Sequence, residues 1–216
     1  MKLYVEGGGD TALLKSACRE GFSKFLGKAG LAGRMPRVVA CGSRADAYDS
    51  FCTALRNGEP AMLLVDSEAP VLPAAQSGDA SQRKDRDRWL PWFHLTQPQG
   101  DDWDRPAGSD DLQCHLMVQC MEAWLLADRE TLKTFFGHGF REGDLPASGH
   151  PIEQIGKQQL YDALARASRD CRTKGSYGKA DHSFKLLSQI DPGKVVNASP
   201  WAQRLVETLQ ARMSQR

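Results

Sequence analysis

Residues 2–11 read KLYVEGGGDT, and this stretch decides the fold class of the 216-residue chain. The apolar run up to Val5 predicts a short strand, and the three glycines after Glu6 predict a tight turn. Asp10 or Thr11 is expected to cap a helix, because apolar residues then recur at helical spacing as far as Leu26. The stretch therefore predicts a strand, loop and helix unit of an α/β protein.

The same alternation continues along the chain. Residues 37–41 predict a second strand and residues 45–55 a second helix, while residues 61–65 are wholly apolar and predict a third, central strand. A further strand is expected over residues 115–118, followed by a helix over residues 122–136. Strands that alternate with helices form parallel sheets, so we expect a parallel sheet flanked by helices.

The second half of the chain carries a different pattern. Beyond Gly137 the apolar spacing becomes helical, and four apolar residues recur at four-residue spacing near the end: Trp201, Leu205, Leu209 and Met213. We therefore predict an α/β domain over residues 1–136 and a C-terminal helical annex over residues 137–216.

The segment between the third and fourth strands is rich in Pro, Gly, Ser, Asp and Arg. Its charge run, residues 83–88, is expected to form a solvated helix face. The apolar patch that follows, with Trp89, Trp92 and Phe93, is expected to cover the sheet edge or to meet a partner.

The composition narrows the class of partner and compartment. The 28 Lys and Arg residues balance 27 Asp and Glu residues, so any phosphate-binding surface has to be local. The six cysteines are scattered without a CxxC pair, which predicts reduced, mostly buried thiols, and His115 beside Cys114 is expected to be structural. No segment is apolar enough for a signal peptide or a membrane span, so we expect a cytoplasmic protein with no membrane association.

Carboxylates follow two of the predicted strands. Glu6 comes directly after the first strand, and Asp66 and Glu68 follow the third, close enough in an extended segment to point to the same side. Ligands of such sheets bind beyond the carboxyl ends of the strands. Carboxylate oxygens are the ligands that Mg²⁺ and Mn²⁺ prefer, so the three acids predict a site for one of these ions. A helix-terminal or turn role is the alternative for each acid.

Several other polar residues are candidates either for the site or for structural roles. Asp10 is either the helix cap or an additional ligand, and Glu122 is either a paired structural carboxylate or part of the site. Asp128 is expected to be a solvated helix residue. The basic segment over residues 172–179 suits phosphate contact through Lys174 and Lys179, with a solvated loop as the alternative.

Two of these segments resemble the motifs of TOPRIM domains. Residues 5–10 (VEGGGD) resemble the first motif, and residues 65–68 (VDSE) resemble the second, except that Glu68 replaces the commoner aspartate and is one methylene longer. TOPRIM domains occur in topoisomerases, primases and OLD-type nucleases. The resemblance implies that Glu6 acts in acid–base catalysis and that the acids of the second motif, Asp66 and Glu68, bind metal.

A closer resemblance is to a small bacterial family of TOPRIM-like proteins, often encoded beside AAA-type ATPases in mobile or defence gene clusters. Residues 117–128 (MVQCMEAWLLAD) and the later FKLL segment at residues 184–187 carry it. It implies a metal-dependent nuclease acting on DNA or RNA, possible association with an AAA-type ATPase, and a role in phage defence. The oligomeric state is left open.

Two alternatives follow from the same residues. In the first alternative, the chain is a regulatory subunit of an ATPase complex and docks through the patch over residues 89–93 and through the helical tail. The third reading rests on residues 7–12, which match a dinucleotide-binding fingerprint. We consider it weak, because the charge of Glu6 would lie beside the pyrophosphate.

Overall fold

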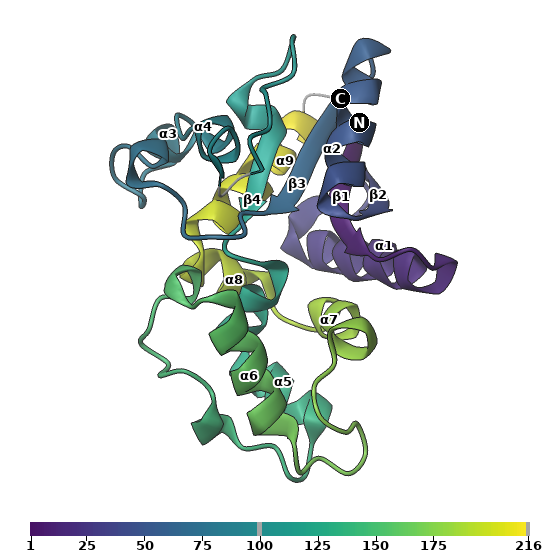
Figure 1. The fold of residues 1–216 in the computed structure, drawn as a ribbon, viewed down its shortest axis with the longest axis vertical. Coiled ribbons are helices and arrows are strands. Elements are labelled where there is room, and N and C mark those ends of the chain that lie inside the picture. Colours follow the sequence, from purple (N-terminus) through teal and green to yellow (C-terminus); the bar gives the residue numbers. More distant parts are fainter. Residues whose placement is uncertain (99–100, 215–216) are drawn as a thin grey trace.

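The computed structural model describes residues 1–98 and 101–214, and it contains a parallel sheet of four strands (Figure 1). The strands are β1 (Lys2–Gly8), β2 (Arg37–Gly42), β3 (Ala61–Asp66) and β4 (Cys114–Met117). Their order in the sheet is β2-β1-β3-β4, so β1 and β3 are central. The predicted α/β class with a parallel sheet flanked by helices is confirmed.

The helices between the first strands begin at side-chain caps, of which only the first was predicted. Thr11, rather than Asp10, caps α1 (Ala12–Leu26), because its hydroxyl accepts a hydrogen bond from the N–H of Leu14. Ser43 caps α2 (Arg44–Arg56) through a reciprocal capping box with Asp46. A turn over Gly27–Leu31 then leads from α1 towards β2.

The two faces of the sheet are covered by different parts of the chain. Side chains alternate along β1, so that Leu3 and Val5 join one apolar core while Tyr4 joins the other. The first core holds α1 and most C-terminal helices, and the second holds α2 and the segment between β3 and β4. The crossover helices α1 and α2 therefore lie on opposite faces of the sheet.

This arrangement places a switch point between β1 and β3. The chain moves from β1 to β2 on one side, then crosses to β3 on the other side. In open α/β sheets, ligands bind outside the carboxyl ends of the strands where the strand order reverses in this way. Glu6 and Asp66 lie at the carboxyl ends of these two strands.

The single helix predicted over residues 122–136 is divided into two in the structure. The chain forms a 3₁₀ helix over Met121–Ala127 and then α5 (Arg129–Phe136), because the carboxylate of Asp128 caps the second helix at the N–H of Thr131. Asp128 is also not solvated as predicted. It is buried, and it accepts hydrogen bonds from Lys194 and from the N–H of Asp191.

The charged and aromatic segment before β4 is less exposed than predicted. Arg86, at the end of α3 (Arg83–Arg86), is buried and bonds both carboxylate oxygens of Glu207 at 2.7 Å. Trp89 and Trp92 are buried in the second core, the latter in α4 (Pro91–Leu95). These two rings cover the sheet, which was one of the two predicted roles, so they are not exposed for docking to a partner.

The C-terminal part is helical, as predicted. It contains α6 (Lys157–Ser168), α7 (Lys179–Leu187), α8 (Pro192–Ala198) and α9 (Pro200–Ser214). Short 3₁₀ turns occupy Pro73–Ala75, Asp111–Gln113, Glu142–Asp144 and Ile152–Gln154. The domain boundary at residue 137 stays a prediction. Residues 99–100 of the segment before the fourth strand and residues 215–216 of the helical annex lie outside the described residues.

The cysteine and histidine predictions are confirmed. The cysteines all lie in described segments and are free thiols, buried except for the half-buried Cys52. His115 is buried between the carbonyl of Leu112 and the guanidinium of Arg204. Within residues 1–98 and 101–214, no helix is both long and apolar enough to cross a membrane.

Candidate metal centre and its pocket

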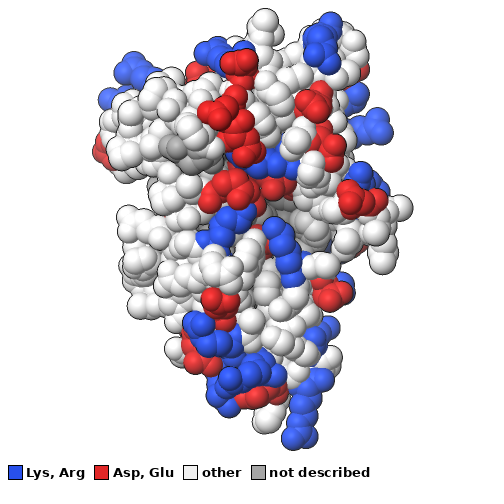
Figure 2. Space-filling view, viewed as in Figure 1, with Lys and Arg blue, Asp and Glu red and all other residues white. Residues whose placement is uncertain are grey.

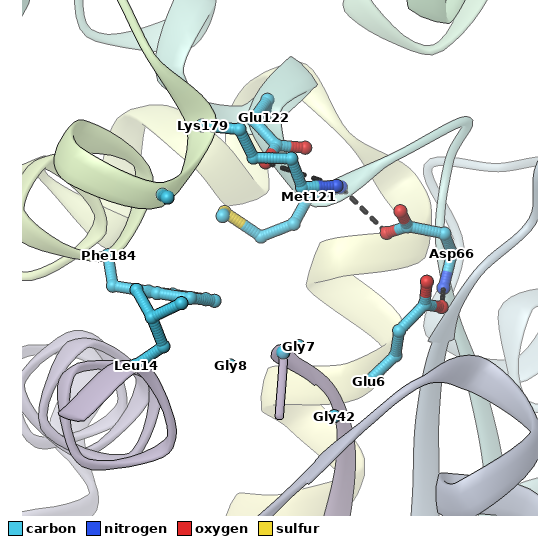
Figure 3. A pocket seen from close by; sticks show the side chains of 12 residues that line it. Glu6, Gly7, Gly8, Leu14, Gly42, Asp66, Met121, Glu122, Lys179 and Phe184 are labelled. Atoms are coloured by element: carbon cyan, nitrogen blue, oxygen red, sulfur yellow. Dashed lines mark hydrogen bonds and ion pairs between the residues drawn. The ribbon is translucent and has the colours of Figure 1, made fainter. Parts of the chain in front are cut away.

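Three carboxylates converge at the carboxyl edge of the sheet. One side-chain oxygen from each of Glu6, Asp66 and Glu68 lies within 4.8 Å of the others, as the sequence predicted. Oε2 of Glu6 also accepts a hydrogen bond of 2.9 Å from the N–H of Asp66, which joins the ends of β1 and β3 (Figure 3). The parallel strands thus bring acids sixty residues apart into one group.

Asp66 is the most buried acid of this group. Its side chain is nearly inaccessible, and Oδ1 accepts a hydrogen bond of 2.8 Å from the N–H of Met121. Burial, followed by the neighbouring charges of Glu6 and Glu122, holds the pKa of Asp66 well above its usual range. Burial likewise raises the pKa of Glu6, against the hydrogen bond from the Asp66 N–H. The edge is therefore a site where negative charge is costly without a cation.

Two basic side chains partly neutralise the acids. Lys157, the first residue of α6, places Nζ 2.8 Å from both oxygens of Glu68 and 3.4 Å from Oδ2 of Asp66. Burial disfavours its charge, but the carboxylates of Asp66 and Glu68 raise the pKa of Lys157. Arg44 lies 3.9 Å from Oε2 of Glu6 and donates to the carbonyl of Asp66 at 3.0 Å. Neither residue was predicted from the sequence.

The geometry of the acids fits a hard divalent cation. Oxygens bound to one octahedral Mg²⁺ at about 2.1 Å lie about 3.0 Å apart when adjacent and about 4.2 Å apart when opposite, so oxygens up to 4.8 Å apart have to move closer by about 0.6–1.8 Å. All donors are carboxylate oxygens, which suits Mg²⁺ or Mn²⁺. Lys157 Nζ now lies between Asp66 and Glu68, so an ion there has to displace this ammonium group.

A pocket of about 320 Å³ opens beside the acids. Glu6 and Asp66 line one side of it, and Gly7–Gly9 with Gly42 form the adjoining backbone wall. Gly8 has φ +91°, and a Cβ atom there would lie 2.8 Å from the Cα of Lys15. Glycine is therefore required for the loop to turn and for α1 to lie against it.

The opposite side of the pocket comes from the 3₁₀ helix over Met121–Ala127 and from α7. Glu122 is fully buried and accepts hydrogen bonds from Tyr161 (3.1 Å) and Ser183 (3.0 Å). Its Oε1 lies 3.6 Å from Nζ of Lys179, which is half-exposed and lines the pocket. Burial opposes the charge of Lys179, but the carboxylates of Glu122 and Asp66 raise its pKa. Glu122 is thus a paired carboxylate that also belongs to the pocket wall.

The remaining predicted residues lie outside this group. Asp10 is exposed and lines neither the acid cluster nor the pocket. Lys174 is exposed, with Nζ 5.0 Å above the ring of Phe135, and it does not line the pocket. Figure 2 shows acidic and basic side chains gathered where the sheet meets the helical part. Sequence reasoning found Lys179 by its basic neighbours, but it had no signal for Lys157.

Comparisons with known proteins identify a family. No curated protein and no solved structure matches the chain. A family model described as a domain of unknown function, DUF4276, matches residues 5–210, which include the three acids and every residue that lines the pocket. The chain therefore belongs to the DUF4276 family.

Proposed function

We propose that this protein is a divalent-metal-dependent phosphodiesterase, and specifically a nuclease that acts on DNA or RNA. The observation that carries the proposal is the convergence of Glu6, Asp66 and Glu68 at the switch point of the sheet. A lysine that lines the adjoining pocket adds a positive group for a phosphate oxygen. Such a group of side chains suits the hydrolysis of a phosphate ester by water with the help of a hard cation.

Each residue has a role that follows from its contacts. Glu6, Asp66 and Glu68 would hold Mg²⁺ or Mn²⁺, and the bound ion would polarise the phosphate and lower the pKa of a bound water. Oε2 of Glu6 is engaged by a backbone N–H, which leaves Oε1 to accept or deliver a proton. Burial raises the pKa of Glu6, which makes its carboxylate a stronger proton acceptor than an exposed glutamate. Lys179 contacts a phosphate oxygen from across the pocket.

The wider context is part of the proposal. The likeness to TOPRIM domains is supported by the position of both motifs, since each acid follows a central parallel strand. We further propose that the enzyme works in the cytoplasm beside an AAA-type ATPase in a defence or mobile-element system. A regulatory subunit is less well supported, because Trp89 and Trp92 of its docking patch are buried. Dinucleotide binding is disfavoured, because Glu6 itself lines the pocket.

The test is cleavage of end-labelled DNA and RNA, single-stranded and duplex, with Mg²⁺ or Mn²⁺, by the chain alone and with the ATPase encoded beside it. EDTA should abolish cleavage. Glu6→Gln should abolish it while sparing most metal binding, because the amide keeps one carbonyl oxygen but no longer exchanges the proton. Asp66→Asn should weaken metal binding as well.

Asp10→Asn is the matched control, because it neutralises an exposed acid near the same loop. It should cleave like the wild type. Circular dichroism has to show that all variants are folded. Full activity of both folded variants, Glu6→Gln and Asp66→Asn, would reject the site.

A further inference from the structure

The pocket beside the acids has a second, apolar side that phosphate chemistry does not use. We infer that it holds one unpaired nucleobase of the substrate, next to the phosphate that is cleaved. This inference rests on the proposed function and names its substrate more closely, as single-stranded or locally unpaired nucleic acid.

The apolar side is formed by four side chains from three parts of the chain. Leu14 comes from α1, Met121 follows β4, and Ala180 and Phe184 come from α7. Figure 3 shows the Phe184 ring edge-on, projecting from α7 towards the glycine loop, and the Met121 side chain reaching into the same cavity. Between them lies open space that adjoins Glu6 and Asp66.

The backbone fixes the Phe184 ring in this position. A Cβ atom on Gly7 would lie 2.9 Å from Cζ of Phe184, and one on Gly21 would lie 2.8 Å from its carbonyl oxygen. Both glycines thus permit α7 to approach β1 and α1 closely. The ring also packs against Phe22 with centroids 6.5 Å apart. The Phe184 ring is therefore an aromatic surface of the pocket whose position is set by its packing against neighbouring residues.

The size and chemistry of the pocket suit a base. Its volume of about 320 Å³ lies at the lower end of the range for small-molecule sites, about 300–1,000 Å³. A charged phosphate bound at the acids would not bind to an apolar wall, so the wall has to contact another part of the substrate. In a nucleic acid, the flat and largely apolar group nearest to a phosphate is the base, and bases stack on aromatic rings with little regard to sequence.

A paired base cannot enter such a pocket. A base inside a duplex has to leave the helix to reach it, at a cost in unpairing and unstacking. The polar groups opposite the apolar wall are already engaged, because Glu122 is bonded to Tyr161 and Ser183 and paired with Lys179. We therefore expect a preference for unpaired strands without strong preference for one base.

Ala180 allows the pocket to be filled without disturbing the core. It is exposed on α7 and lines the pocket, so Ala180→Trp places an indole where the base would bind. Leu13→Trp is the matched control, because Leu13 is 80% exposed on α1 and does not line the pocket. Both variants are to be compared with the wild type by thermal unfolding before any binding measurement.

The assay is fluorescence anisotropy with labelled 12-nucleotide probes and Ca²⁺ in place of Mg²⁺, together with Mn²⁺ affinity by calorimetry. The wild type should bind a single strand at least about tenfold more tightly than a duplex or an abasic strand. Ala180→Trp should lose that advantage and keep its Mn²⁺ affinity, whereas Leu13→Trp should bind like the wild type.

The outcomes separate this inference from the proposed function. Equal wild-type affinity for the single strand, the duplex and the abasic strand, with Mn²⁺ still bound, overturns the inference alone. The wild-type comparison decides this even if Ala180→Trp does not fold. If the wild type neither binds Mn²⁺ nor cleaves any probe, the proposed function fails and the inference falls with it.

Discussion

Lys157 pairs with two of the carboxylates that we propose as metal ligands, so removing its charge should strengthen metal binding. Lys157→Met keeps an unbranched side chain and deletes the ammonium group that lies 2.8 Å from Glu68 and 3.4 Å from Asp66. In the wild type, an incoming ion has to break these contacts before it binds. In the variant, the carboxylates are already free.

The contacts set the size of the effect. A hydrogen bond between charged groups contributes about 1.5–3 kcal/mol when it is buried, and an exposed ion pair contributes about 0–1 kcal/mol. Lys157 is 24% exposed and Glu68 36% exposed, so solvent screening reduces the higher figure. We expect about 1–2 kcal/mol, which corresponds to Mn²⁺ binding about 5–30-fold more tightly.

Calorimetric titration with Mn²⁺ measures this directly, and thermal unfolding provides a second readout. In EDTA the variant should unfold at a lower temperature than the wild type, because the buried carboxylate of Asp66 has lost its partner. Saturating Mn²⁺ should raise the unfolding temperature more in the variant than in the wild type.

Lys174→Met is the control for net charge, since Lys174 is exposed and does not line the pocket. It should leave Mn²⁺ affinity unchanged. Unchanged or weaker Mn²⁺ binding by folded Lys157→Met would refute the idea that the ammonium group and the ion compete for one position.

Three further predictions concern stability. In EDTA at pH 8, Asp66→Asn should unfold at a higher temperature than the wild type, and calorimetry should show this difference in unfolding temperature narrowing towards pH 4. Because the pKa of Asp66 is raised by folding, the destabilisation caused by its charge grows as the pH rises from the unfolded-state pKa through the folded-state pKa. A difference in unfolding temperature that widens on acidification would contradict this. Gly8→Ala should lose about 1–3 kcal/mol in urea unfolding and bind Mn²⁺ less well, because its Cβ meets Lys15; Gly108→Ala, also at positive φ but with open space around it, should lose less. Arg204→Met should lose about 3–5 kcal/mol in the same assay, because this buried guanidinium donates to four backbone carbonyls, and a loss below 1 kcal/mol would show that they find other partners.

The convergence of Glu6 and Asp66 was predictable because it depends only on local patterns. Each acid ends an apolar run, and parallel strands end at the same edge of a sheet. Glu68 was predicted to share a side with Asp66 in an extended segment, but it lies in a bend after β3 with φ +64° and reaches the group from there. These acids needed no knowledge of how the C-terminal half packs.

The cationic partner of the acids was not predictable in this way. Lys157 reaches Asp66 from 91 residues away, and neither its neighbours nor its spacing distinguish it from other lysines at the start of a helix. Its position depends on how α6 packs, which the apolar periodicity of a single helix does not determine.

The exposure of two groups of residues could not be judged from their neighbours. Trp89 and Trp92 follow a charge run and were predicted either to cover the sheet edge or to meet a partner, and both rings cover the sheet. Asp128 lies in an apolar helical pattern, and its ability to cap a helix was overlooked. In both cases the tertiary fold decided where the side chain lies, rather than the average polarity of the segment.

The most direct test of the metal centre is anomalous diffraction from crystals soaked in Mn²⁺. We predict one or two peaks among the carboxylates of Glu6, Asp66 and Glu68, with oxygen ligands at about 2.2 Å and Lys157 moved away from Glu68. A structure at saturating Mn²⁺ in which the three acids are well ordered, no peak lies among them and Lys157 still pairs with Glu68 would contradict the account.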